Sequence, residues 1–457
     1  MKNPKDVLLI LAAFLLLSNC TNTGPTLIRI ETPEMPLVRA ALYFPFGSGT
    51  EPSGQEGATL LVSRWTDFGT IKRSSTEFND ATLNLGAAID TTINPRFTLI
   101  TVEAPSDKFA EAWKLTLEKI RSPRLNQSDL ENVRNGIVSA KKSRLTSWIV
   151  TGNQLATSVI YAGTPEAHSE YGTDSSLKVL TSHELKKFHA VTFGKGPALV
   201  LVSKTLPENS MAAIRESLRN WGSTFQKAEP RTLLRKGRNL LIIERPGSSQ
   251  AYLFFVKPGP TPGTNEHALA SIGTQLLGSN GGNSSILFDE LRAKRGLTYH
   301  ASTQVSKKPN KQMIVGVTFG ANETIGELAS LYMKEWKKFY ETKDIPETDL
   351  KEAYIAYKAT RARDAGETIG EIIAASAETI SISGDVKSIW ADPQVTQAAF
   401  NSAMAKWLVP DDFTLLVLGD SSKVKTVLEN SIGPVADTKV LPPNADWDAV
   451  SKAIVGK

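Results

Sequence analysis

Few side chains in this sequence are suited to hold a catalytic metal ion or to act as a general base. A zinc site needs His, Cys, Asp or Glu ligands at fixed spacings, such as two histidines one helical turn apart. His183 and His189 are six residues apart, which suits different helix faces, and His183-Glu184 lacks the second histidine of a zincin helix. The other histidines are His168, His267 and His300. We interpret all five as surface or packing residues and expect no metal site in this chain.

Composition describes an ordinary folded chain of 457 residues. Charged residues make up 22% and hydrophobic residues 41%, which excludes collagen-like, low-complexity and broadly disordered chains. The net charge of +5 is not gathered into a basic stripe with interleaved aromatic residues, so nucleic acid is not an expected partner. The single cysteine excludes an intrachain disulfide and a cysteine-based zinc site.

The N-terminus has the pattern of a cleaved export signal. Lys2 and Lys5 precede an unbroken apolar run over 7–17, which is shorter than the roughly 20 residues that span a bilayer. The run ends just before Cys20 and resembles a bacterial lipoprotein signal, although Asn19 departs from the usual small residue. We therefore expect a signal peptide at 1–19, lipidation at Cys20 and a tether at 20–26. The alternative is an ordinary secretory signal with an incidental cysteine.

Lipidation would place the protein in the bacterial cell envelope, anchored by lipid and facing the periplasm. Thr21 stands where an Asp commonly retains lipoproteins at the inner membrane. We therefore expect the outer membrane rather than the inner one.

The rest of the chain contains a weak internal repeat at an offset of about 212–220 residues. The paired segments, in order, are 28–33 with 241–246, 40–47 with 251–259, 125–133 with 345–353, and 197–205 with 413–421. Four matches in one order predict two related domains. Their predicted limits are 27–225 and 239–435, with a linker at 226–238 and a C-terminal tail at 436–457.

Each half shows the same predicted order of elements. A hairpin rich in β-branched and aromatic residues comes first, followed by a helix, further strands and long amphipathic helices. The predicted helices are 57–68, 107–121, 128–145, 265–277 and 349–363, and a capping box at Thr181–Glu184 begins another that ends near Val191. Strands followed by helices predict an α+β fold, with helices on one face of a mostly antiparallel sheet in each half.

The helix over 57–68 and its exit turn read GATLLVSRWTDFGT (57–70). With the whole chain after the tether, this segment resembles the pitrilysin, insulinase and mitochondrial-processing-peptidase family of zinc metallopeptidases. That family carries G-x-x-H-x-x-E-H and then a short stretch ending in G-T, and Gly57, Gly69 and Thr70 match at that spacing. The resemblance implies two homologous halves that close into a clamshell.

The resemblance also implies that the zinc-binding positions have lost their chemistry. The H-x-x-E-H positions fall on Leu60, Ser63 and Arg64, and the third ligand position falls at about Val138, seven residues after Glu131. Leucine and valine have no lone pair for zinc, serine lacks the basic carboxylate, and arginine would repel the metal. We expect no cofactor in this chain and inactivity when it is alone.

A second family motif is intact in NSSILFDELRAKRGLTYHAS (283–302). It resembles the family signature S-x-L-F-x-x-L-R-x-x-x-G-L-x-Y, with Arg292 and Tyr299 at the expected spacing. In the family this pair reaches the zinc site of the other half, holds the substrate backbone and stabilises the oxyanion. A structural role for both residues is the alternative. The glycine-rich stretch 278–285 lacks the G-K-[ST] ending of a phosphate-binding loop.

These features predict the non-metal subunit of a heterodimeric zinc metallopeptidase. The partner would carry H-x-x-E-H and the zinc, and Arg292 and Tyr299 would act on the substrate in trans. Peptides or unfolded protein segments would be the substrates. The alternative is a pseudopeptidase that serves as an envelope peptide-binding or scaffold lipoprotein without a catalytic partner.

Overall fold

The fold is described from a computed structural model. It describes residues 24–32, 34–227, 231–278, 285–306, 312–342, 345–364, 369–383 and 393–456. The expected signal peptide, the lipidation site Cys20 and the first part of the tether lie outside the described residues. In the described part of the chain, no helix is long and apolar enough to cross a bilayer.

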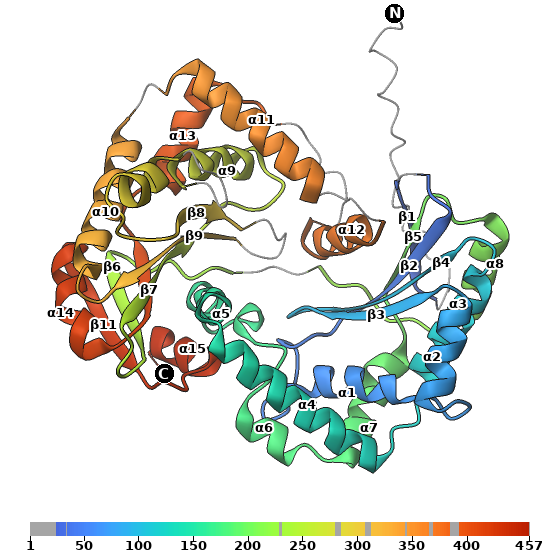
Figure 1. The fold of residues 1–457 in the computed structure, drawn as a ribbon. Coiled ribbons are helices and arrows are strands. Elements are labelled where there is room, and N and C mark those ends of the chain that lie inside the picture. Colours follow the sequence, from blue (N-terminus) through green and yellow to red (C-terminus); the bar gives the residue numbers. More distant parts are fainter. Residues whose placement is uncertain are drawn as a thin grey trace, which may run out of the picture.

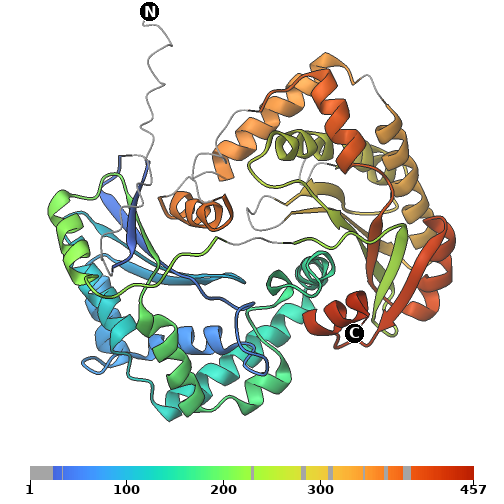
Figure 2. The same cartoon turned by 180° about the vertical axis from the view of Figure 1, so that it is seen from behind.

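The protein forms two lobes, each built around one β-sheet (Figures 1 and 2). The N-terminal lobe contains β1 (Thr26–Ile30), β2 (Leu37–Phe44), β3 (Ala88–Ile93), β4 (Thr98–Pro105) and β5 (Leu199–Ser203). The C-terminal lobe contains β6 (Arg238–Glu244), β7 (Gln250–Pro258), β8 (Ala301–Val305), β9 (Met313–Ala321), β10 (Phe413–Gly419) and β11 (Val435–Leu441). The predicted α+β class is confirmed.

Helices make up most of the remaining structure. In the first half they are α1 (Ala58–Trp65), α2 (Ser75–Asn84), α3 (Phe109–Arg121), α4 (Gln127–Thr146), α5 (Trp148–Ile160), α6 (Asp174–Val179), α7 (Ser182–Val191) and α8 (Glu208–Ser217). In the second half they are α9 (Asn265–Gly278), α10 (Ile325–Glu341), α11 (Glu347–Asp364), α12 (Ile369–Ser383), α13 (Gln397–Trp407), α14 (Ser421–Ser431) and α15 (Trp447–Val455). The six predicted helices match α1, α3, α4, α7, α9 and α11, and Thr181 forms the predicted capping box.

The two sheets share one strand order over five strands. The order is β1-β5-β2-β4-β3 in the first sheet and β6-β10-β7-β9-β8 in the second, where β11 adds a further edge strand beside β6. Both sheets are mixed. The β1/β5, β6/β10 and β6/β11 pairs are parallel, and the other pairs are antiparallel.

The first two strands of each half do not form the predicted hairpins. β5 lies between β1 and β2, and β10 lies between β6 and β7. Every residue of β5 and β10 is buried. A strand buried on both faces belongs inside a sheet, so β5 and β10 each separate the two strands that open their half of the chain.

Helices cover both faces of each sheet, which corrects the expectation that they pack on one face. In the first sheet Leu42 points into the core that contains α1 and α3, and its neighbour Tyr43 points to the opposite face. That opposite face is covered by α12, a helix from the second half of the chain (Figure 1). The side chains of α12 in this contact are Ile373, Ala377 and Ile380.

The second sheet is covered in the reciprocal way. Phe254 on β7 and Leu416 on β10 point to the face on which α5, from the first half, packs. The helices α9, α10 and α14 belong to the core on the other face. Each half of the chain therefore supplies a helix that completes the core of the other half.

Residues 436–457 are part of this fold rather than a tail. Strand β11 pairs with β6 over most of its length, and α15 packs against α5. The Ser451 hydroxyl accepts a hydrogen bond from the Gly163 amide at 2.8 Å. The C-terminal segment therefore links the second sheet to the first half of the chain.

The packing of α5 predicts a large effect of a small substitution. A Cβ atom on Gly152 would lie 2.0 Å from the ring of the buried Phe254, whereas Gly136 in α4 has open space around it. We expect Gly152→Ala to lower the free energy of unfolding by roughly 1–3 kcal/mol, because helix and sheet must separate. The matched control Gly136→Ala should be neutral or stabilising by up to about 1 kcal/mol. Urea unfolding measures both, and equal stability of the two variants would contradict this packing.

Candidate functional site

Helix α1 carries Leu60 and Arg64, expected at two zinc-ligand positions, and Ser63, expected at the general-base position, and it begins at a capping carboxylate from the preceding loop. Gly57 adopts a left-handed conformation with φ of 94° and precedes the helix. The carboxylate of Glu51 accepts hydrogen bonds from the Gly57 and Thr59 amides, both at 2.7 Å. These bonds satisfy backbone donors that a helix start leaves open, and they place negative charge at the positive end of the helix.

No motif in the sequence indicated Glu51. It is 8% exposed, and burial raises its pKa to about 7 although the two amide hydrogen bonds act in the opposite direction. A helix start without a capping residue of its own, preceded by an acidic loop residue, is the signal that indicates such a contact. Its position fixes where α1 begins and therefore which way the following side chains point.

Two of the expected zinc-ligand positions, Leu60 and Val138, belong to or pack against one hydrophobic core. Leu60 is 7% exposed, and Val138 on α4 packs against the same cluster. The hydroxyl of Ser63 is buried without a hydrogen-bond partner in the described residues. Arg64 points outward, with its guanidinium 3.9 Å from the Asp67 carboxylate. Two aliphatic side chains, a hydroxyl and a cation do not provide the ligands that bind a zinc ion.

The matching Gly69-Thr70 pair holds the exit turn of α1. The Thr70 hydroxyl donates to Glu118 at 2.5 Å and accepts the Lys72 and Arg73 amides. A Cβ atom on Gly69 would lie 2.6 Å from the Arg73 carbonyl oxygen, so only glycine fits there. Gly69 and Thr70, which match the family motif, therefore stabilise the turn after α1.

The histidines take part in packing and backbone contacts. His168 stacks on Trp447 with centroids 4.1 Å apart, and His189 shares a hydrogen bond with the Ile120 carbonyl. Burial lowers the pKa of His168, His189 and His300, which favours their neutral form. Within the described ranges, no group of three His, Cys, Asp or Glu side chains is placed to hold a metal ion.

Arg292 and Tyr299 lie together in the second half. Arg292 belongs to a short π-helical segment (Phe288–Ala293), and its guanidinium carbon lies 4.4 Å from the centroid of the Tyr299 ring. It also lies 5.0 Å from the Phe288 centroid, so two aromatic rings contact the same cation. Tyr299 is 72% exposed. The pair therefore presents a phenol and a guanidinium at the surface, where they can contact another molecule.

Buried hydrogen bonds fix the backbone beside Tyr299. The hydroxyl of Thr298 is bonded to the Phe319 carbonyl on β9 at 2.6 Å and to the His300 carbonyl at 2.9 Å. Gly296, with φ of 64°, lies in the loop between the π-helical segment and β8. The exposed tyrosine thus lies two residues before β8, next to backbone that these hydrogen bonds hold.

Two family models match successive parts of the chain. Residues 27–162 match "Insulinase (Peptidase family M16)", and residues 180–357 match "Peptidase M16 inactive domain". Together these matches cover more than two thirds of the chain. The chain belongs to the M16 (insulinase) peptidase family.

Curated M16 relatives differ in the activity that their names state. A protein of Helicobacter pylori named "Non-peptidase homolog YmxG" is 21% identical over 59% of this chain. An uncharacterized zinc protease of Mycobacterium leprae is 24% identical over 61%, and one of Streptomyces coelicolor is 22% identical over 62%. The matches span 62–64% of the length of these relatives.

Solved structures share the fold. The M16 inactive domain from Pseudomonas fluorescens has a TM-score of 0.73 at 20% identity, with 87% of this chain and 96% of that chain covered. A protease from Helicobacter pylori has a TM-score of 0.70 at 16% identity, and 87% and 97% are covered. The periplasmic protease PqqL from Escherichia coli has a TM-score of 0.66 at 15% identity, with 87% of this chain but 44% of PqqL covered.

Restoring ligands tests the assignment of the degenerate positions. We expect the triple variant Leu60→His, Arg64→His, Val138→Glu to bind one zinc ion, because α1 and α4 pack against each other. Zinc should then raise its Tm, since a ligand that binds only the folded state stabilises it. Calorimetric titration and thermal unfolding measure both effects.

The matched control carries the same two histidines with Ala140→Glu, two residues further along α4 and therefore on another helix face. It should not bind zinc at one equivalent. A folded triple variant without zinc affinity would show that these positions do not converge.

Proposed function

We propose that this M16 protein is the non-metal subunit of a heterodimeric metallopeptidase. In this proposal, Arg292 and Tyr299 contact a substrate held at the zinc site of a partner chain that carries H-x-x-E-H. The observation that carries the proposal is the exposed Arg292–Tyr299 stack in a chain whose α1 positions do not fit a metal.

The chemistry of the pair suits peptide-bond hydrolysis. A phenol hydroxyl donates a hydrogen bond to the oxyanion that forms when water attacks a carbonyl, and a guanidinium donates to backbone carbonyls of the substrate. The stack with Phe288 and the Thr298 hydrogen bonds limit the motion of both groups, so they need little reorganisation when charge develops. This chain alone supplies neither a metal nor a general base at α1.

Substrate binding is proposed to use strand addition in the chamber of the clamshell. Strands β3 and β8 are edge strands, each with a neighbouring strand on one side only in the described sheets. Peptides or unfolded segments can add to such an edge through main-chain hydrogen bonds. Strand β3 alternates exposed and half-buried side chains, which leaves room for a peptide of varied sequence.

The second candidate is a pseudopeptidase that binds peptides or serves as a scaffold without a catalytic partner. The relative named as a non-peptidase homolog favours it. In both cases we propose that Cys20 is lipidated and anchors the protein in the envelope, facing the periplasm and at the outer membrane.

Purification of the native protein under mild conditions separates the two candidates. We expect a homologous subunit with H-x-x-E-H and about one zinc ion per complex to co-purify. Mass spectrometry and metal analysis of both chains provide the measurement. A stable monomer or homodimer without such a chain would contradict the heterodimer and favour the scaffold.

Removing one hydroxyl tests the role of Tyr299. Tyr299→Phe should lower the kcat of the complex by roughly 10- to 100-fold without dissociating it, because the ring and its stack with Arg292 remain while the oxyanion donor is lost. The matched control is Tyr171→Phe, which removes a hydroxyl from another tyrosine that lies against an arginine, Arg144. If both variants retain full kcat with an intact complex, the Arg292–Tyr299 pair is structural.

A further inference from the structure

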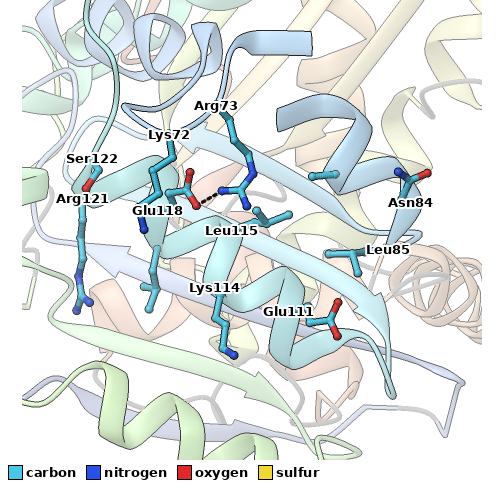
Figure 3. Close-up of a pocket in the computed structure, with 12 residues that line it drawn as sticks. Lys72, Arg73, Asn84, Leu85, Glu111, Lys114, Leu115, Glu118, Arg121 and Ser122 are labelled. Carbon is cyan, nitrogen blue, oxygen red and sulfur yellow. Dashed lines mark hydrogen bonds and ion pairs between the residues drawn. The ribbon is translucent and has the colours of Figure 1, made fainter. Parts of the chain in front are cut away.

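An open groove lies on the outer side of the N-terminal lobe, between α2, α3 and the turn after Gly69 (Figure 3). Its volume is about 680 Å³, and most of its charged lining residues are basic. They are Lys72, Arg73, Lys114 and Arg121, with Glu111 and Glu118 as the acidic ones. It is separate from both the α1 positions and the Arg292–Tyr299 pair.

The cations of this groove are only partly neutralised. Arg73 is paired with Glu118, which leaves Glu111 as the other carboxylate of the lining. In Figure 3 the charged ends of Lys114 and Arg121 lie away from the Arg73–Glu118 pair, and Lys72 lies nearer to Glu118, whose pKa it helps to lower. The groove therefore presents a net positive surface.

Two exposed aliphatic residues are direct sequence neighbours of residues that line the groove. Ile71 is 77% exposed and directly precedes Lys72, and Leu83 is 73% exposed and precedes the groove residue Asn84. Among the described residues, these are the two most exposed large hydrophobic side chains. Exposed aliphatic groups beside lysines are typical of surfaces that lie at the boundary between headgroups and acyl chains.

The groove is adjacent to the point where the chain enters the fold. Gly24 lies near Leu218, since a Cβ atom on Gly24 would be 3.2 Å from the Leu218 carbonyl oxygen, and Arg121 donates a hydrogen bond to the neighbouring Ser217 carbonyl at 2.6 Å. The Arg121 guanidinium also stacks on Trp221 at 4.0 Å. Tryptophan and arginine are enriched where proteins contact membrane interfaces.

The short tether limits how far this surface can be from an anchored lipid. Four residues, Cys20 to Thr23, precede Gly24. A chain of that length extends at most about 14 Å. If Cys20 carries the lipid, Gly24 and the adjoining Arg121 are held close to the headgroups, where cations and anionic lipids attract each other.

We propose that this groove is a membrane-facing surface that binds the headgroups of anionic phospholipids. The orientation that it gives to the anchored protein rests on the proposed lipidation of Cys20, whereas the affinity of the groove for headgroups does not. The lysines and Arg121 bind phosphate groups, and Ile71 and Leu83 enter the interface beside them. The contact orients the N-terminal lobe toward the bilayer and leaves the Arg292–Tyr299 pair on the other lobe.

Vesicle flotation with the unlipidated chain from residue 20 onward tests the surface itself. We expect binding to vesicles made of equal parts phosphatidylglycerol and phosphatidylcholine, and little binding to phosphatidylcholine alone. Binding should weaken between roughly 0.1 M and 0.5 M salt, because screening shortens the range of the attraction. Lys72→Glu/Lys114→Glu should lower the affinity at least about tenfold.

The matched control is Lys423→Glu/Lys425→Glu on α14 in the other lobe, which changes the net charge equally (Figure 1). It should bind like the unmodified chain. Equal binding by the Lys72/Lys114 variant, equal losses in both variants, or no preference for anionic vesicles would overturn the proposal. Circular dichroism confirms that each variant is folded.

Metabolic labelling with palmitate tests the anchor separately, with Cys20→Ser as its control. Vesicle binding without labelling would contradict the lipid anchor but support the surface. Labelling without headgroup binding would support the anchor and overturn the surface.

Discussion

The reciprocal packing of α5 and α12 is the contact on which the arrangement of the two lobes depends. Adjacent residues of the central strands, such as Leu42 and Tyr43, point to opposite faces of a sheet, and both faces are apolar. A sheet that is apolar on both sides must be covered on both sides. Each half covers one face with its own helices, and the other half covers the second face. The lobes therefore stabilise each other through core contacts and not only through the linker.

This constraint also explains which features could be predicted from the sequence. Helices such as α3 and α7 carry their signals locally, in apolar spacing and in the capping box at Thr181. The place of β5 between β1 and β2 has no local signal, because it depends on a strand almost 160 residues away from β2. The covering of the first sheet by α12 depends on still more distant residues. Local patterns thus determine elements, and long-range burial determines their neighbours.

In the candidate site, too, some residues could be identified from local sequence patterns and others only from the folded structure. The spacing of Arg292 and Tyr299 identified a pair that the structure does bring together, and Leu60 and Val138 do share one core. Glu51 was missed because a carboxylate in a loop indicates a cap only when the helix that it meets is known. The buried residues at the α1 positions and the exposed Tyr299 differ in what they contribute to the stability of the fold. Filling the α1 positions with Leu60 adds buried apolar surface and stabilises the lobe, whereas an exposed tyrosine such as Tyr299 contributes little to stability and is available for contact with other molecules.

The origin of α12 has a consequence for how this chain is made. The ribosome synthesises the chain from its N-terminus. All five strands of the first sheet are complete by Ser203, but the helix that covers their second face begins at Ile369. Until then Ala41, Tyr43 and Leu201 have no partner layer from the chain itself. The N-terminal lobe is thus an incomplete core for the time in which about 165 further residues are synthesised, on the order of ten to thirty seconds at typical rates. During this interval the uncovered apolar face favours aggregation.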